Sequence, residues 1–237
     1  MLQIERQEQI MELLGKTPAM RIGQIAAALY TSEATVRRDL AVMEQKGLVR
    51  RVYGGVTLKK EDMPMEIRRQ EHAAAKEAIA LKAAALLQDG MTVFLDSSST
   101  VQHLLPHLTR FRDLTVMTNS HRVTEVLADS KVRLICTGGE LVKRNMAYVG
   151  RIAEATLENF CPELAFISSQ GVDKSGEITD ASEEETALRR AVLRRAKRCV
   201  FLCDSSKVGK RFFCRLGHLS DMDEVIVDGD FPKDLLP

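Results

Sequence analysis

One short segment, Leu29–Leu40, restricts the fold of this chain more than any other, because it has the pattern of a helix with two different faces. Ser32 is a good residue to begin such a helix, since its hydroxyl can accept a hydrogen bond from an early backbone N–H. Val36, Leu40 and Met43 then follow at i, i+4 and i+7, which puts them on one apolar stripe. That stripe must face a hydrophobic core, so the segment is predicted to be a docked helix.

The opposite face of the predicted helix carries two arginines among small side chains. Arg37 and Arg38 can pair with phosphate or with guanine N7 and O6, while Ser32 and Thr35 near the helix start can reach the DNA backbone or base edges. An isolated arginine pair is more often a solvated helix face, so the flanking sequence has to decide between the two interpretations.

The flanking sequence favours a winged helix-turn-helix. Upstream, Gln24–Tyr30 is a short apolar helix that a turn separates from the next one. Downstream, Gly47–Leu58 has the pattern of two short strands joined at Gly54 and Gly55, a wing. A supporting helix is predicted over residues 3–14, and the DNA-binding domain is predicted to occupy residues 1–60.

These residues resemble the N-terminal signature of the DeoR family of bacterial regulators of sugar metabolism. Thr31 stands where that family usually has valine, and Tyr53 stands where it has the wing histidine. A phenol can still donate a hydrogen bond to phosphate, so the resemblance implies that Arg51 and Tyr53 of the wing contact DNA. The residues that match the signature are Ser32, Thr35, Val36, Arg37, Arg38, Asp39, Leu40, Glu44, Gly47, Arg51, Gly54 and Gly55.

Length and charge agree with a small basic head on a larger body. The 237 residues suffice for two domains, and residues 1–60 carry a net charge of +4 against −3 for the remainder. No apolar run approaches ~20 residues, and the first residues are charged, so neither a membrane span nor a signal peptide is expected and the protein is predicted to be cytoplasmic.

The five cysteines have neither Cys-x-x-Cys spacing nor an even count, which predicts reduced, mostly core thiols.

The remainder of the chain alternates between helices and strands. Lys59–Pro64 is polar, so residues 61–75 are predicted to contain the linker and the start of one long helix, Glu66–Gln88. Alternation of this kind predicts a mostly parallel α/β domain over residues 76–237. Buried strands are expected at 91–96, 114–117, 132–136, 164–168, 199–203 and 224–227, and helices at 101–108, 122–128, 149–160 and 183–195.

Polar clusters follow several of these strands, and ligands of parallel α/β sheets bind at that edge. Any one cluster is more often a plain helix cap or turn, but four of them at equivalent strand ends favour a binding site for an anionic ligand, with Lys207 supplying a cation. The predicted ligand-binding residues are Asp96, Ser97, Ser98, Ser99, Thr100, Thr118, Asn119, Ser120, Gly138, Gly139 and Lys207.

The clusters also resemble the effector domain of the DeoR family, which is similar to the ribose-phosphate isomerase fold and implies a phosphorylated sugar as ligand. Ser98 and Ser99 stand where the family has glycine and threonine. A serine at the glycine position could narrow the site or change the ligand.

Outside these motifs, the helix Glu183–Arg198 is rich in arginine and is interpreted as a solvated face or an oligomer contact. The histidines have no metal-ligand spacing, and neither a metal nor a cofactor is expected.

Three functions remain to be compared. The first is a repressor that binds double-stranded operator DNA as a homo-oligomer under control of a phosphorylated sugar. The second is a phosphosugar isomerase-like enzyme, for which Asp96, Asp173 and Glu185 are possible bases although no motif fixes one, so an enzyme is not expected. The third is an interaction module that has lost its ligand, which the Ser98 substitution leaves open.

Overall fold

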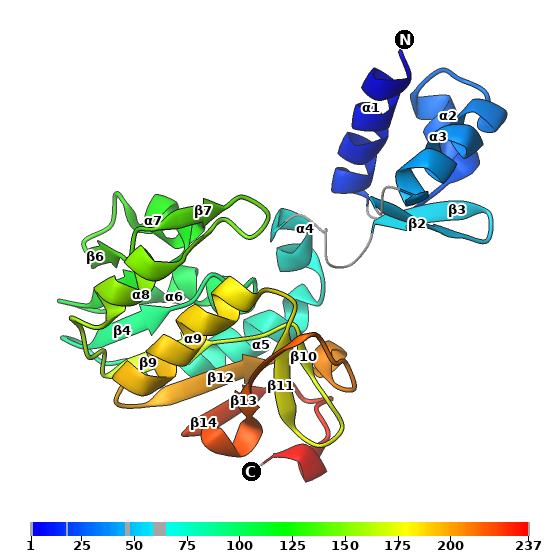
Figure 1. Ribbon diagram of the computed structural model, residues 1–237. Coiled ribbons are helices and arrows are strands. Elements are labelled where there is room, and N and C mark those ends of the chain that lie inside the picture. Colours follow the sequence, from blue (N-terminus) through cyan, green and yellow to red (C-terminus); the bar gives the residue numbers. More distant parts are fainter. Residues whose placement is uncertain (1, 18, 46–47, 59–64, 237) are drawn as a thin grey trace. The chain divides into compact units, whose positions relative to one another are not determined.

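The computed structural model describes residues 2–17, 19–45, 48–58 and 65–236. The chain forms two compact units, a head (Met1–Arg68) and a body (Arg69–Pro237), which are described separately (Figure 1). The predicted linker Lys59–Pro64 and the family position Gly47 lie outside the described residues.

The head has the predicted winged helix-turn-helix fold, with three helices and an antiparallel sheet of order β1-β3-β2 among its described residues. The strand β1, which was not anticipated, pairs with β3 and completes the wing. Gly55 lies so close to this strand that a Cβ there would be 2.5 Å from the Met20 carbonyl oxygen, which explains the need for glycine. In chain order the elements are α1 (Gln3–Lys16), β1 (Ala19–Arg21), α2 (Ile22–Ala28), α3 (Glu33–Gln45), β2 (Val49–Val52) and β3 (Gly55–Leu58).

The predicted apolar stripe of α3 is the centre of the head's core. Val36, Leu40 and Met43 are fully buried against Ile10 and Leu14 of α1. Burial of a large apolar side chain stabilises a fold by roughly 1.5–3 kcal/mol, so this stripe fixes which face of α3 points outward.

The body is built on a six-stranded sheet of order β14-β12-β9-β4-β5-β6 in which every neighbouring pair is parallel. Its remaining strands form a three-stranded antiparallel sheet, β10-β11-β13, and a hairpin, β7-β8. In chain order the elements are α4 (Met65–Gln70), which spans the division between the units, α5 (Ala73–Ala84), β4 (Thr92–Leu95), η2 (Val101–Leu104), α6 (Leu105–Leu108), β5 (Thr115–Thr118), α7 (His121–Leu127), β6 (Arg133–Cys136), β7 (Glu140–Val142), β8 (Ala147–Val149), α8 (Arg151–Leu157), β9 (Leu164–Ile167), β10 (Gly171–Val172), β11 (Glu177–Asp180), α9 (Glu183–Arg195), β12 (Cys199–Cys203), η3 (Ser205–Lys207), β13 (Cys214–His218), η4 (Leu219–Asp221), β14 (Glu224–Val227) and η5 (Lys233–Leu235).

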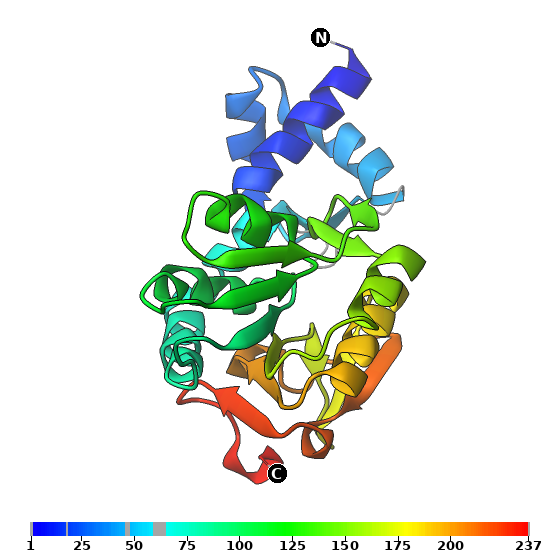
Figure 2. The same ribbon diagram turned by 90° about the vertical axis from the view of Figure 1, so that its left-hand side faces the viewer.

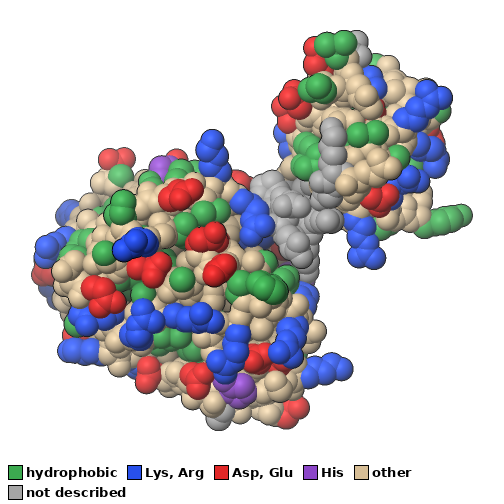
Figure 3. Space-filling model, viewed as in Figure 1, with side chains coloured by type: hydrophobic (Ala, Val, Ile, Leu, Met, Phe, Trp, Pro, Cys, Tyr) green, Lys and Arg blue, Asp and Glu red, His purple; other side chains and the backbone are tan. Residues whose placement is uncertain are grey.

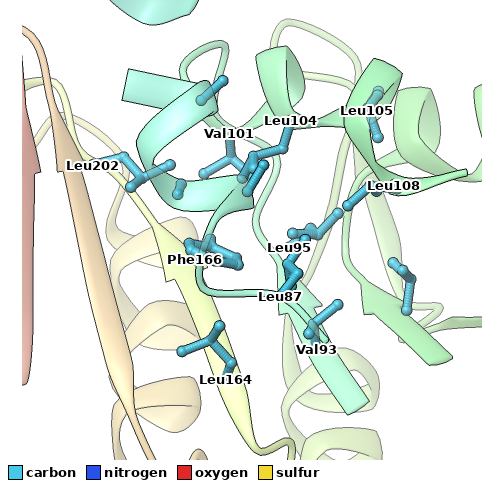
Figure 4. Packing of buried hydrophobic residues seen from close by; sticks show 14 of the residues in the cluster. Leu87, Val93, Leu95, Val101, Leu104, Leu105, Leu108, Leu164, Phe166 and Leu202 are labelled. Atoms are coloured by element: carbon cyan, nitrogen blue, oxygen red, sulfur yellow. The ribbon is translucent and has the colours of Figure 1, made fainter. Parts of the chain in front are cut away.

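Helices cover both faces of the parallel sheet (Figure 2). Alternate residues of β4 show this directly, because Val93 and Leu95 pack with α5, α6 and α7 whereas Phe94 packs with α8 and α9. Figure 4 shows the first of these clusters, in which Phe166 and Leu202 of neighbouring strands meet Val101 and Leu104. The predicted α/β class with a mostly parallel sheet is confirmed.

The predicted single helix Glu66–Gln88 is wrong. The structure has two helices, α4 and α5, with a corner at His72, whose φ of 53° lies in the left-handed region. The sequence there is rich in helix formers, so the break comes from tertiary contacts and not from local propensity. The His103 imidazole Nε2 donates to the Arg69 carbonyl at 3.0 Å, which ties the end of α4 to η2.

Other boundaries shift by smaller amounts. The predicted helix 101–108 begins as the 3₁₀-helix η2, and the predicted helix 149–160 is shorter, as α8. In the described part of the chain, no helix is both long and apolar enough to cross a membrane.

The cysteines are all free, but they are less buried than predicted. Only Cys199 and Cys203 are core thiols, whereas Cys136 and Cys161 are exposed and Cys214 is half-buried. Burial raises the pKa of both Cys199 and Cys203 to about 12, so neither forms thiolate at neutral pH.

Thiol reactivity should therefore divide the cysteines sharply. We expect a water-soluble maleimide at pH 8 to label Cys136 and Cys161 of the folded protein rapidly, and Cys199 and Cys203 only after unfolding. Mass spectrometry of the peptides checks this. Rapid labelling of Cys199 or Cys203 in the folded protein would contradict the burial described here.

Candidate functional site

The outward face of α3 begins with the two hydroxyl residues predicted to approach DNA. Ser32 acts as the helix cap, because its Oγ accepts a hydrogen bond from the backbone N–H of Thr35 at 3.2 Å. The two hydroxyls also lie 2.9 Å apart. Both residues are thus held in place at the start of the helix.

Arg37 and Arg38 both point to solvent, as predicted, but they differ in their partners. The Arg37 guanidinium donates to Glu33 at 3.0 Å, and both side chains of this pair are 54% exposed. For Arg38 no partner lies among the described residues. Arg38 is consequently the better placed of the two to pair with an external anion.

Asp39, which directly follows Arg38 in the chain, has a role that the sequence did not indicate. It is buried, and its carboxylate accepts hydrogen bonds from the Arg6 guanidinium of α1, one of them at 3.1 Å. This ion pair joins α1 to α3, so Asp39 orients the recognition helix. A charged residue directly beside the apolar stripe was the sequence signal that could have indicated a buried ion pair.

The wing carries the remaining predicted DNA contacts. Tyr53 lies at its tip and is fully exposed, and the Arg51 backbone N–H donates to Glu44 at 2.8 Å. Tyr30, which was not predicted, is 98% exposed with φ of 50° at the turn between α2 and α3. Figure 3 shows several Lys and Arg side chains on the surface of the head.

In the body, the strand ends bring several of the predicted ligand-binding residues together. Because the parallel register aligns the carboxyl ends of β12, β9, β4, β5 and β6, the loops that follow them share one edge of the sheet. This edge is the candidate effector site.

Hydrogen bonds to the Asp96 side chain fix the loop that follows β4. The buried carboxylate accepts from the backbone N–H groups of Ser98 at 2.8 Å and Ser168 at 3.0 Å, and from Arg189 Nε at 2.9 Å. The Ser98 Oγ in turn accepts a hydrogen bond from the N–H of Val101, the first residue of η2, at 3.2 Å. Asp96 therefore fixes the loop, and the serine found in place of the family glycine closes the turn that leads into η2.

Lys207 reaches this loop from the far side of β9. Its Nζ donates to Thr100 Oγ1 at 2.8 Å and to Ser168 Oγ at 2.7 Å, and it lies 3.6 Å from Asp204 Oδ2. Burial alone would raise the pKa of Asp204, but Lys207 and the Ser206 hydroxyl outweigh it and the pKa is lowered. Ser168 was not predicted, although it follows a strand as the predicted clusters do.

A second lysine, also missed by the sequence analysis, approaches the same loop. Lys76 in the first turn of α5 is buried, and its Nζ donates to Ser99 Oγ at 3.2 Å. The sequence gave no signal for it, because it lies among other charged residues of a predicted helix.

Within the next predicted cluster, two of the three side chains are occupied by the fold. Thr118 Oγ1 donates to the Leu95 carbonyl at 2.7 Å and accepts from the Ser120 N–H, while Ser120 Oγ caps α7. Asn119 differs, because its Nδ2 donates to the Tyr148 carbonyl at 3.2 Å but its buried Oδ1 has no hydrogen-bond partner among the described residues. Such an acceptor suits a ligand hydroxyl.

The two predicted glycines follow β6. Both have positive φ, 64° at Gly138 and 109° at Gly139, and a Cβ at Gly139 would lie 2.5 Å from the Val149 carbonyl oxygen. Gly139 is thus required for the packing of β8 against this turn. At Gly138 the space beyond the Cα is open.

Arg189 corrects the interpretation of the arginine-rich helix. It is buried rather than solvated, and its guanidinium pairs with Asp96 at 2.9 Å, Asp180 at 3.1 Å and Glu185 at 3.2 Å. Burial opposes its charge, but the three carboxylates outweigh this and raise its pKa. Glu185 also accepts from Ser97 Oγ at 3.4 Å. Arg189 thus anchors the floor of the site, whereas Arg190, Arg194 and Arg198 are exposed.

No described group of three or more His, Cys, Asp or Glu side chains is arranged to hold a metal ion.

Comparison with protein families matches both units. Residues 6–62 match the DeoR-like helix-turn-helix domain, and residues 71–229 match the DeoR C terminal sensor domain. The lactose phosphotransferase system repressor of Staphylococcus aureus is 31% identical over 231 residues, covering 94% of this chain and 91% of that protein. The transcriptional regulator GlpR of Haloferax volcanii is 30% identical, covering 99% and 93%, and the regulator GolR of Listeria innocua is 30% identical, covering 99% and 94%.

Solved structures are similar to part of this chain at low sequence identity. The translation initiation factor subunit eIF2B delta from Chaetomium thermophilum has a TM-score of 0.51 at 16% identity, over 67% of this chain and 57% of that one. Ribose 5-phosphate isomerase from Methanocaldococcus jannaschii has a TM-score of 0.42 at 17% identity, over 56% and 53%.

Proposed function

The chain belongs to the DeoR family of DNA-binding transcriptional regulators, and we propose that it represses an operon of carbohydrate metabolism under the control of a phosphorylated sugar. The observation that carries the proposal is the contact of Lys207 with Thr100 and Ser168 at the ligand-binding edge of the sheet. An ammonium group among hydroxyls suits a phosphate.

In this proposal the head binds double-stranded operator DNA through one face. The α3 residues Ser32, Thr35, Arg37 and Arg38 enter the major groove, and the wing residues Arg51 and Tyr53 contact the backbone. The relatives named above are transcriptional regulators, one of them a lactose phosphotransferase system repressor, which supports a role in sugar metabolism. Two heads on a palindromic site require a homo-oligomer, and operator DNA places the protein in the cytoplasm.

The effector in this proposal is held by groups from several loops. Lys207 and the hydroxyls of the loop that follows Asp96 take the phosphate, and the free Asn119 Oδ1 accepts a hydrogen bond from a sugar hydroxyl. Gly138 adds an open turn at the same edge. Coupling to DNA arises if the effector binds the DNA-competent and DNA-incompetent states with different affinity.

In the competing hypothesis, a phosphosugar isomerase-like enzyme, the three candidate bases are already engaged by other groups of the described chain. Asp96 and Glu185 are buried in the ion-pair cluster of Arg189, and Asp173 accepts hydrogen bonds from Ser175 Oγ at 2.7 Å and from backbone N–H groups. A general base must be able to reach a substrate proton. We therefore propose that the protein is not an enzyme.

A thermal-shift screen of the full-length protein tests the effector. We expect a phosphorylated sugar, and not its unphosphorylated parent, to raise the melting temperature, because a ligand of the folded state stabilises it. Lys207→Met should weaken binding of that phosphate about tenfold or more, the worth of one charge-assisted hydrogen bond. A Lys174→Met variant, which changes an exposed lysine elsewhere in the body, is the control. Equal shifts in the wild type and Lys207→Met would contradict this site.

A further inference from the structure

We propose that Lys76 is a second phosphate-binding ammonium of the effector site and the residue through which ligand occupancy reaches the corner between α4 and α5. This inference rests on the proposed effector site and adds to it a ligand contact and a direction for the signal. The corner is defined here as residues 69–77.

The first step is the convergence of two lysines on one short loop. Lys76 donates to Ser99 at 3.2 Å and Lys207 donates to Thr100 at 2.8 Å, so ammonium groups from α5 and from the segment after β12 meet adjacent residues of the loop. Both lysines also act on the buried Asp204 carboxylate, whose Oδ2 has no hydrogen-bond partner among the described residues. Ammonium groups that reach one loop from two sides suit a phosphate, because each can pair with a phosphate oxygen as a point charge.

The second step is the position of Lys76 in the chain. It lies one turn after His72, the left-handed residue at which α4 ends and α5 begins. A ligand that draws the Lys76 ammonium away from Ser99 therefore acts on the first turn of α5. None of the ligand-binding residues predicted from the sequence belongs to this segment.

The third step is the set of contacts that fasten the corner to the segment after the loop. Glu77 accepts from His107 Nε2 at 2.9 Å and lies 3.4 Å from His103 Nδ1. His103 Nε2 donates to the Arg69 carbonyl of α4 at 3.0 Å. Because η2 begins directly after Thr100, a change in the loop reaches α4 through His103 and α5 through Lys76 and Glu77.

Inorganic phosphate is the probe for the experiment, titrated at constant ionic strength into the full-length protein. In the wild type, we expect phosphate to raise the melting temperature and to change amide hydrogen exchange both in residues 97–104 and in the corner. In Lys76→Met, phosphate should bind about tenfold or more weakly, as for loss of one charge-assisted hydrogen bond. At saturating phosphate, its exchange response should persist in residues 97–104 but be lost from the corner.

Two further variants separate a ligand contact from a structural role. Lys76→Arg keeps the positive charge and should retain most of the affinity and of the exchange response. Lys82→Met removes another lysine of α5, whose Nζ donates to the Val227 carbonyl at 2.8 Å, and should behave as the wild type. Melting temperatures without phosphate show whether each variant is folded.

The outcomes are distinguishable. Lys76→Met with wild-type affinity and a wild-type exchange response would overturn this inference and leave the effector site intact. Weakened binding with an unchanged response in the corner would overturn the coupling role. If phosphate binds Lys207→Met as tightly as it binds the wild type, the proposed effector site itself is wrong. If phosphate has no effect on the wild type, both the effector site and the role of Lys76 are overturned.

Discussion

Replacement of Arg189 by methionine is expected to lower the free energy of unfolding of the body by about 3–5 kcal/mol, the cost of breaking a buried ion pair from one side. Arg189 is buried, and it is the shared partner of Asp96, Asp180 and Glu185. Without it three carboxylates remain close together away from solvent. Urea unfolding followed by circular dichroism measures the loss.

Arg194→Ala, on the exposed side of the same helix, is the matched control and should leave the free energy of unfolding nearly unchanged. A loss in Arg189→Met no larger than that of this control would contradict the buried cluster.

The second large effect is expected in the head, where Arg38→Ala should weaken operator binding about tenfold to a hundredfold, the range for loss of one bidentate base contact. Arg37→Ala should cost less, because the Arg37 guanidinium is shared with Glu33 at 3.0 Å. Gel shifts with a duplex selected from a random pool measure both.

Lys16→Ala is the control for the loss of one positive charge. It removes a cation at the end of α1, away from α3 and the wing in the sequence. It should reduce affinity only slightly and equally for all sequences. If Arg38→Ala bound the selected duplex as tightly as Lys16→Ala, the outward face of α3 would not be the DNA-reading surface.

Periodic and buried segments of this fold could be predicted from the sequence. The stripe at Val36, Leu40 and Met43 fixes α3 because a helix with one apolar face has a single way to dock. The run that forms β12 is predictable at the residues where it occurs, since a continuous apolar run is typical of a strand buried on both faces.

Features that depend on distant contacts could not be predicted. Asp96 and Arg189 are 93 residues apart in the chain, and nothing local distinguishes Arg189 from the exposed arginines of α9. The contact of Lys76 with the loop could not be predicted either, because nothing local distinguishes this lysine from the other charged residues of α5. The corner at His72 arises in a helix-forming sequence, so local propensity predicts the wrong structure there.

For the candidate site, the strand-end rule located the right loops but not the role of each side chain. Asp96, Thr118 and Ser120 lie at the predicted edge, yet the fold already uses their hydrogen-bonding atoms. Asn119 keeps an acceptor that a ligand could engage, whereas Lys207 would have to exchange contacts with the Thr100 and Ser168 hydroxyls for contacts with a ligand. This difference depends on hydrogen bonds that only the folded chain defines.

The central claim is that a phosphorylated sugar bound in the body alters the affinity of the head for DNA. Its most direct test is the dissociation constant of the full-length protein for a selected operator duplex, measured with and without each sugar phosphate that stabilises the protein. The account predicts a change of about fivefold or more with one phosphorylated sugar, the lower end of ordinary allosteric coupling, and none with its unphosphorylated parent. An unchanged dissociation constant at saturating ligand would contradict it.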